Sequence, residues 1–288
     1  KKLQQGQNGM GSILEARRRP ERSRLAIRQL RLVMVGDGVV TAVMARPLRV
    51  DVKDGWYHVT ARGIERMAIF EDDRDHEHFL ELLEEMSNRY GVEVHVYCLL
   101  GNHYLLLIQT PRANASPAVQ WLNVSYSVWF NKKRGRSGHV FQGRFGSVLI
   151  DGEGSLALDA SVYINLNPIR TEGYGLGKSA NKAEAMGWVE PDREQLKRRL
   201  KALRQFQSSS FRAYAGYSRK PEWLVTDELT KRGGRQEYRR YVQEHVTRGA
   251  DPEGFEDFRG RLALGLANHS NRRKIARSLL SHLANGET

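Results

Sequence analysis

The sequence has almost no cysteine and lacks any long apolar run. Cys98 is the only cysteine in 288 residues, which excludes a disulfide framework and a zinc site built from cysteines. A single thiol fits a reducing compartment, and we expect a cytoplasmic protein. No stretch approaches the roughly 18 consecutive apolar residues that a membrane helix requires, so we expect no membrane partner.

Acidic residues are also scarce relative to basic ones. The chain has 46 Lys and Arg against 33 Asp and Glu, a formal net charge of +13. Residues 1–43 hold nine basic and three acidic residues, which leaves +7 on residues 44–288. The body of the protein is therefore basic without its first segment. Such a balance is typical of proteins that bind nucleic acid, although a solvated surface excess would produce the same charge.

Three regions differ in pattern. In residues 1–43 an apolar stretch is interrupted by Asp37, and Met44 resembles an ordinary translation start, so we expect this segment to be a disordered leader. Residues 44–175 alternate between strand and helix patterns. Residues 176–288 have mostly helical spacing. We predict one α+β domain over 44–175, followed by a mainly helical accessory region over 176–288.

Local patterns between residues 56 and 170 predict seven elements in the order strand, helix, strand, strand, helix, strand, helix. Strands are expected at 56–63, 92–102, 103–110 and 138–151. Helices are expected at 73–91, from 116 to the basic segment 131–138, and from 151 to about Pro168. The pair Gly101-Asn102 predicts either a tight hairpin or a bulged continuation. This order favours an α+β fold, with a ferredoxin-like antiparallel sheet and helices on one face.

The basic segment after the second predicted helix has two interpretations. It contains four cations in close succession: Lys132, Lys133, Arg134 and Arg136. Cations at a helix C-terminus are favoured by the helix dipole alone. Aromatic residues lie on both sides, however, and Gln142 and Arg144 follow between Phe141 and Phe145. Basic groups that neutralise phosphates, beside aromatic rings that accept bases, are typical of single-strand binding, although most of these rings must be core.

Two further stretches contain candidate site residues. In GNHYLLLI (101–108), His103 and Leu105 point to the same side of a strand, where two histidines could share one metal ion. A lone histidine on a strand is, however, more often a structural ring than a metal ligand. In YINLNP (163–168), Tyr163 and Asn167 are neighbours on one helix face. Tyr163 could pack in the core, or act as a nucleophile with Asn167 as an oxygen ligand for a divalent ion.

Several stretches together resemble the single-tyrosine HUH transposases, and among them the REP-associated tyrosine transposases. These stretches are YHVTARGIERMAIF (57–70), GNHYLLLIQTP, LNVSYSVWFNKKRGRSGHVFQGRFGSVLI and YINLNPIR. The resemblance covers roughly residues 44–175 closely and later stretches, such as SFRAYAG (210–216), patchily. It implies the HUH endonuclease fold and a protein that acts on single-stranded DNA hairpins.

The resemblance also implies roles for individual residues. In that family two histidines separated by one bulky residue bind a divalent ion, with a third ligand from the tyrosine helix. His103 matches the first histidine, Tyr163 the nucleophile and Asn167 the third ligand, whereas Leu105 stands where the second histidine belongs. Tyr163 would attack a DNA phosphodiester to form a 5′-phosphotyrosine, with Mg²⁺ or Mn²⁺ in the site. The residues implied to contact DNA are Arg62, Arg66, Lys132, Lys133, Arg134, Arg136, Gln142, Arg144 and Arg170.

Leu105 leaves the chemistry open. Leucine has no lone pair, so the metal site implied by the resemblance is incomplete. One hypothesis is a DNA-strand transferase that is intact or weakened, acting as a monomer or homodimer. The alternative is a protein that binds DNA hairpins but has lost nuclease activity. A third option, an RNA-binding module, has less support because no aromatic RNP-type motif is visible.

Overall fold

The structure is a computed structural model that describes residues 51–247, except 151, 153–155, 186 and 232. The segment 1–43, expected to be a disordered leader, lies outside the described residues. Within the described residues, no helix combines the length and apolar character that crossing a lipid bilayer requires. The helices and strands follow in this order: β1 Gly55–Arg62, η1 Ile64–Arg66, α1 Asp73–Tyr90, β2 Glu93–Leu100, β3 His103–Thr110, α2 Ala115–Lys133, β4 Gly146–Ile150, α3 Leu156–Leu166, η2 Asn167–Ile169, η3 Glu172–Tyr174, α4 Lys178–Ala185, α5 Arg193–Gln205, α6 Phe211–Ala215, α7 Asp227–Thr230 and α8 Gly234–Thr247.

The four strands form one antiparallel sheet in the order β2-β3-β1-β4. This order, with α1 after β1 and α2 after β3, is the ferredoxin-like arrangement, so the predicted α+β fold class is confirmed. Gly101 and Asn102 form a tight hairpin turn, because Leu100 pairs directly with His103 across it. Of the two possibilities for this pair, the hairpin is the one that the structure contains.

Helix α1 begins and ends where its sequence predicts, within one residue. Asp72 is the N-cap, and it forms a capping box with Asp75: each side chain accepts a hydrogen bond from the other residue's backbone N–H. Gly91 ends the helix with a φ of 64°, a left-handed conformation that glycine adopts without strain. These local signals fix the helix ends independently of packing.

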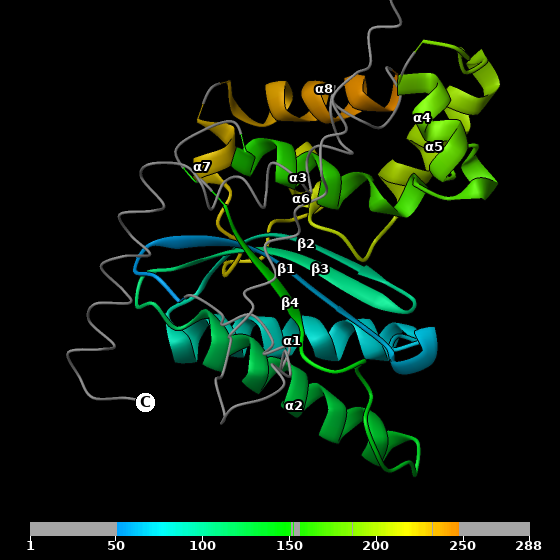
Figure 1. Ribbon diagram of the computed structural model, residues 1–288. Coiled ribbons are helices and arrows are strands. Elements are labelled where there is room, and N and C mark those ends of the chain that lie inside the picture. The colour runs from blue at the N-terminus through cyan, green and yellow to red at the C-terminus, as the bar shows by residue number, and fades with distance from the viewer. Residues whose placement is uncertain (1–50, 151, 153–155, 186, 232, 248–288) are drawn as a thin grey trace, which may run out of the picture. The chain divides into compact units, whose positions relative to one another are not determined.

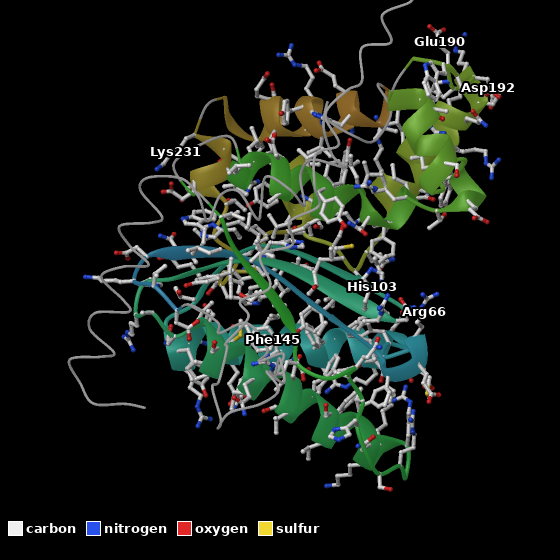
Figure 2. All side chains as sticks on the ribbon, in the orientation of Figure 1. Arg66, His103, Phe145, Glu190, Asp192 and Lys231 are labelled. Carbon is white, nitrogen blue, oxygen red and sulfur yellow. The ribbon has the colours of Figure 1, made fainter. Side chains whose placement is uncertain are left out.

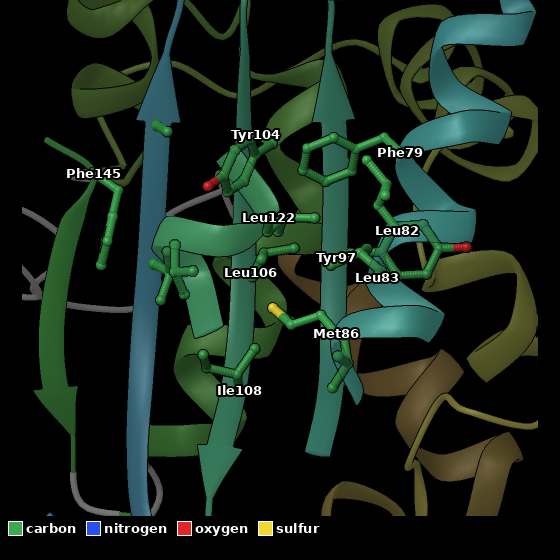
Figure 3. Close-up of a cluster of buried hydrophobic side chains, with 14 of the residues drawn as sticks. Phe79, Leu82, Leu83, Met86, Tyr97, Tyr104, Leu106, Ile108, Leu122 and Phe145 are labelled. Atoms are coloured by element: carbon green, nitrogen blue, oxygen red, sulfur yellow. The ribbon is translucent and has the colours of Figure 1, made fainter. Parts of the chain in front are cut away.

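Helices cover both faces of the sheet (Figure 1). Helices α1 and α2 lie on one face, as expected, and enclose a core that includes Phe79, Leu106 and Leu122 (Figure 3). The expectation of helices on one face alone is incomplete, because α3, α6 and α8 lie on the other. The reason is visible in β3: Leu105 and Leu107 are buried on that second face, so it also needs a cover.

The described helices after residue 176 share their core with the sheet. Phe211 and Val242 belong to the same buried cluster as Leu105 and Leu107. The segment before α6 also lies along the outer edge of β2, where the Leu99 N–H donates to the Ser208 carbonyl at 2.9 Å. That pairing covers an otherwise exposed strand edge. Residues 51–247, where described, therefore belong to one compact unit.

Strand β4 is shorter than predicted. We expected a strand over 138–151, but it begins only at Gly146. Gly138 and Gly143 have φ values of 97° and 67°, and these left-handed conformations interrupt an extended chain. The prediction was wrong because the apolar alternation in this stretch belongs to a bend that packs Phe141 and Phe145 into the core. Gln142 and Arg144 consequently project from this bend rather than from a strand.

Candidate active site

A cleft of about 630 Å³ lies at the end of the sheet where β1 finishes and β3 begins. Strand register brings its walls together, because Arg62 pairs with His103, and Thr60 pairs with Leu105 on one side and Gly146 on the other. Figure 2 shows Arg66 and His103 at this end of the molecule. The cleft is lined by Thr60, Ala61, Arg62, Arg66, Asn102, His103, Leu105, Gln142, Arg144, Gly146 and Tyr163.

Gly146 allows the strands to approach closely beside this cleft. A Cβ atom at this position would lie 2.8 Å from Thr60 Oγ1, which is closer than real Cβ contacts. The residue also begins β4, directly after the bend that contains Gln142 and Arg144. Glycine here therefore brings that bend against the end of β1.

His103 is held by the turn that precedes β3. Its Nδ1 lies 2.7 Å from Asn102 Oδ1, and Asn102 Nδ2 donates to the Arg66 carbonyl at 3.3 Å. With the amide oxygen as acceptor, Nδ1 carries the ring proton and Nε2 carries the lone pair. Burial lowers the pKa of His103 below its ordinary value, and the neighbouring Arg62 charge lowers it further. Both effects favour the neutral imidazole.

Leu105 points to the same side of β3 as His103, as strand alternation predicts. Its side chain is only 2% exposed and belongs to the core that β3 shares with α3. At the cleft it therefore presents hydrocarbon where a second imidazole would provide a lone pair. The leucine packs as an ordinary core residue, continuous with Leu107 on the same face.

Tyr163 enters the cleft from α3 on the second face of the sheet. Its ring contacts two other side chains. The edge of His58 approaches it with 5.8 Å between ring centroids, and Arg170 Cζ lies 4.8 Å from the Tyr163 centroid. A guanidinium over an aromatic ring is a favourable cation–π contact that also restricts the ring. Arg170, predicted to contact DNA, is thus placed against the proposed nucleophile.

Helix α3 is fixed by a buried hydrogen-bond network on its far side. Tyr238 of α8 donates to Ser161 Oγ at 3.0 Å and accepts from Asn165 Nδ2 at 2.8 Å. Ser210 Oγ donates to Asn165 Oδ1 at 3.1 Å. Because all four side chains are buried, each bond also prevents the cost of an unsatisfied polar group. The network thereby sets the position of the helix that carries Tyr163.

The residues present do not fit the divalent metal site that the resemblance implies. Asn167 lies in η2 after the tyrosine helix, its Nδ2 donates to the Tyr163 carbonyl at 2.9 Å, and it does not line the cleft. Leu105 offers no donor atom. Among the residues that the structure describes, no group of three His, Cys, Asp or Glu side chains could hold a metal ion. Of the two histidines that the resemblance implies, only His103 is present.

Positive charge is concentrated in the cleft instead. Arg62, Arg66 and Arg144 line it, and Arg62 Nη2 donates to Gln142 Oε1 at 3.4 Å. Arg66 has a φ of 64°, an uncommon conformation for a residue with a side chain. Four predicted DNA contacts (Arg62, Arg66, Gln142 and Arg144) thus meet at Tyr163. An anion such as a phosphodiester is the ligand that this arrangement favours.

The cations of the basic segment are arranged differently. Lys133 Nζ lies 2.7 Å from Asp72 and 2.8 Å from Asp75, and Arg134 Nε donates to Glu71 at 2.9 Å. Arg134 also hydrogen-bonds Asp75. These pairs join the end of α2 to the start of α1, so these two charges are already balanced by carboxylates. Lys132 is exposed at the last turn of α2, and Arg136 lies 5.9 Å from the Phe130 ring.

The aromatic residues around the basic segment are mostly core. Tyr126 and Phe130 are fully buried, and Phe141 and Phe145 are 7% and 6% exposed. Trp129 is half-buried and stacks on His78 with 4.2 Å between ring centroids. The expectation that most of these rings are structural is confirmed.

Two neighbours of the site were not assigned a role from the sequence. The sequence indicated only that Asn102 is a turn residue, whereas in the structure its side chain orients His103. The sequence did not predict that His58 lies near Tyr163, because this contact joins β1 to α3 across more than a hundred residues. The one local pattern that bears on it is strand alternation, which puts His58 on the same side of β1 as Thr60.

The comparison with protein families agrees with the resemblance. The sequence model of a protein family described as "Transposase IS200 like" matches residues 51–165. No curated protein matches the chain. One similar solved structure is described as "Structure of the REP associates tyrosine transposase bound to a REP hairpin". It is 15% identical, covers 66% of this chain and 97% of its own, and superposes with a TM-score of 0.43.

Proposed function

We propose that this chain, whose residues 51–165 match the model of the IS200-like transposases, binds single-stranded DNA hairpins and cleaves them with Tyr163. One observation carries the proposal. Tyr163 from α3 lines the same cleft as three arginines from β1, η1 and the bend before β4. The motif resemblance to the REP-associated branch supports a hairpin as the substrate. We place the activity in the cytoplasm, with a monomer or homodimer as the active form.

The proposed reaction is a transesterification. The Tyr163 Oη–phosphorus bond forms as the bond between phosphorus and the 3′ oxygen breaks, which leaves a 5′-phosphotyrosine and a 3′-hydroxyl. The phenol proton passes to water, and the departing 3′ oxygen takes a proton from water. Guanidinium groups suit this site because they donate paired hydrogen bonds to the non-bridging phosphate oxygens. A free 3′-hydroxyl could then reverse the step on another strand, which is rejoining.

Leu105 supports a second candidate function, binding without cleavage. The cleft needs only its cations to hold a phosphate, whereas cleavage needs charge stabilisation at the reacting phosphorus. If the missing histidine removed that stabilisation, Tyr163 would contact DNA without reacting. Hairpin binding is common to both candidates.

A covalent-adduct assay separates the two candidates. The full chain is incubated with Mn²⁺ and 3′-labelled hairpins copied from the DNA that flanks its own gene, since the 5′-phosphate fragment stays on the protein. The adduct is read on a denaturing gel for the native protein, Tyr163→Phe and Leu105→His. We expect an adduct from the native protein that Tyr163→Phe abolishes. An adduct from Leu105→His alone would establish the binding-only function.

A further inference from the structure

We propose that Arg62, Arg66 and Arg144 stabilise the reacting phosphate in place of a divalent ion, so that strand cleavage by Tyr163 requires no metal. This inference rests on the proposed function and concerns only how the same site performs it. The metal site that the resemblance implies does not match the side chains that occupy its positions.

The position expected for the second metal ligand is filled by hydrocarbon. Leu105 is 2% exposed and packs in the core beneath the cleft, so a cation there would lose hydration without gaining a ligand. Asn167, the expected third ligand, hydrogen-bonds the backbone of its own helix and does not line the cleft. A dication at His103 would therefore keep one of its three expected ligands and would have a positively charged neighbour in Arg62.

The three arginines come from separate elements that the fold brings to one place. Arg62 is the last residue of β1 and pairs in register with His103. Arg66 follows in η1, with its backbone held in a left-handed conformation. Arg144 projects from the bend that Gly146 brings against β1. Strand pairing and backbone geometry thus set the backbone positions from which these three exposed side chains reach the cleft.

The charge of these arginines is available to a ligand, in contrast to the basic segment. Over the stretch of chain with described coordinates, none of the three forms an ion pair with a carboxylate, and Arg62 bonds only the neutral amide of Gln142. Lys133 and Arg134 are already paired with Asp72, Asp75 and Glu71. Three like charges in one cleft repel each other unless an anion lies between them. A phosphodiester is such an anion.

Guanidinium groups can supply what the reaction demands. As the Tyr163 Oη–phosphorus bond forms and the bond to the 3′ oxygen breaks, negative charge remains on the non-bridging oxygens. Fixed N–H donors aimed at those oxygens stabilise the transition state without rearrangement. The phenol proton leaves to water and the 3′ oxygen is protonated by water, so no metal-bound group takes part. Loss of one such donor typically lowers a rate by about 100-fold or more.

The test measures hairpin binding and adduct formation separately, with the full chain and the same 3′-labelled hairpins. Each is measured in EDTA and in Mn²⁺. We expect native adduct rates that agree within about twofold between the two conditions, and no adduct from Tyr163→Phe. Arg144→Gln should lower the adduct rate about 100-fold in EDTA, and Arg144→Lys should restore part of it. Lys53→Gln removes the same charge beyond the opposite end of β1 and should leave the rate unchanged.

Calorimetric titration with MnCl₂ gives an independent readout, in which we expect no single-site binding to the native protein. Native adduct that forms in Mn²⁺ but not in EDTA would overturn the inference while supporting the proposed cleavage. Hairpin binding without any native adduct would overturn both the inference and cleavage, and leave the binding-only function. A protein that binds no hairpin would overturn the proposed function itself.

Discussion

The two faces of the sheet are covered by helices of different chemistry. Between the sheet and helices α1 and α2 lies an aromatic core that includes Phe79, Tyr126 and Phe130, and ion pairs close its outer end. On the other face, α3 and α8 bury a polar network around Asn165 and Tyr238 within an apolar surround. The candidate site opens at one end of this second face.

This difference indicates that the two faces have different roles. A closely packed apolar core can tolerate little change in shape, and it provides most of the folding free energy. Buried hydrogen bonds contribute less energy but are directional, so they specify where a helix lies. The helix that carries Tyr163 is the one held by such bonds. We infer that the first face stabilises the domain and the second face positions Tyr163.

The largest effect is expected from Phe79→Ala on the first face. Phe79 is fully buried and contacts the rings of Phe70, Tyr104 and Tyr126. Removing the ring should lower the free energy of unfolding by about 4 kcal/mol, because it leaves a cavity that the core cannot close. Urea denaturation measures this, with Met67→Ala at a 40% exposed position as control. Equal losses in the two variants would contradict the assignment of this face as the stabilising core.

Asp75→Asn should have the next largest effect, about 3 kcal/mol of unfolding free energy, since it leaves the charges of Lys133 and Arg134 without their buried partner. Burial alone would raise the pKa of Asp75, but hydrogen bonds from Arg134 and Lys133 lower it to about 2. A lowered pKa means that this stabilisation is complete above the unfolded value near 4 and is lost as pH falls towards 2. Native stability should therefore decline over that range.

The same pH range distinguishes the variant from the native protein. Asp75→Asn should show a shallower decline between pH 4 and about 2, because it lacks the group that titrates there. Asp73→Asn, in the exposed first turn of the same helix, is the matched control and should keep the native slope. Parallel slopes for native protein and Asp75→Asn would refute the role given to this carboxylate.

Tyr238→Phe tests the second face and should cost about 1.5 kcal/mol of unfolding free energy. The change removes one hydroxyl and, with it, one buried hydrogen bond of Ser161 and one of Asn165. If the network positions Tyr163, adduct formation should fall further than the loss of folded protein explains. Tyr90→Phe, at a half-buried position on the first face, serves as control for both measurements. A stable variant with native adduct formation would show that α3 is positioned by apolar packing alone.

The smallest effect is expected in the salt dependence of hairpin binding. Each phosphate contact to single-stranded DNA contributes about 0.7 to the slope of log K against log salt concentration. Arg144→Gln should reduce the magnitude of that slope by about 0.7, whereas Arg134→Gln should change it little because Arg134 is paired with Glu71 and Asp75. Fluorescence anisotropy over a salt series gives both slopes. A larger change in Arg134→Gln would reverse the contrast between the cleft and the basic segment.

Much of the fold follows from short-range patterns. The capping residues of α1, the Gly101-Asn102 hairpin and the strand alternation of β3 depend on neighbours within a few positions. The position of Leu105 beside His103 was also predictable, because alternation is a property of any strand. The length of β4 was not, since Gly138 and Gly143 adopt left-handed conformations within an apolar stretch that otherwise reads as extended.

The order of elements, the resemblance to the HUH transposases and the incomplete metal-ligand pattern could all be predicted, because each depends on contiguous residues. Which cations face the cleft could not be predicted without the tertiary structure. Arg134 and Arg144 are similar in the sequence, but one is paired with α1 carboxylates while the other lies beside Tyr163. The difference between these two arginines arises from contacts with residues about sixty positions away in the sequence or on other elements. Folding brings those partners together, and it therefore decides whether the charge of an arginine is neutralised or available to a ligand.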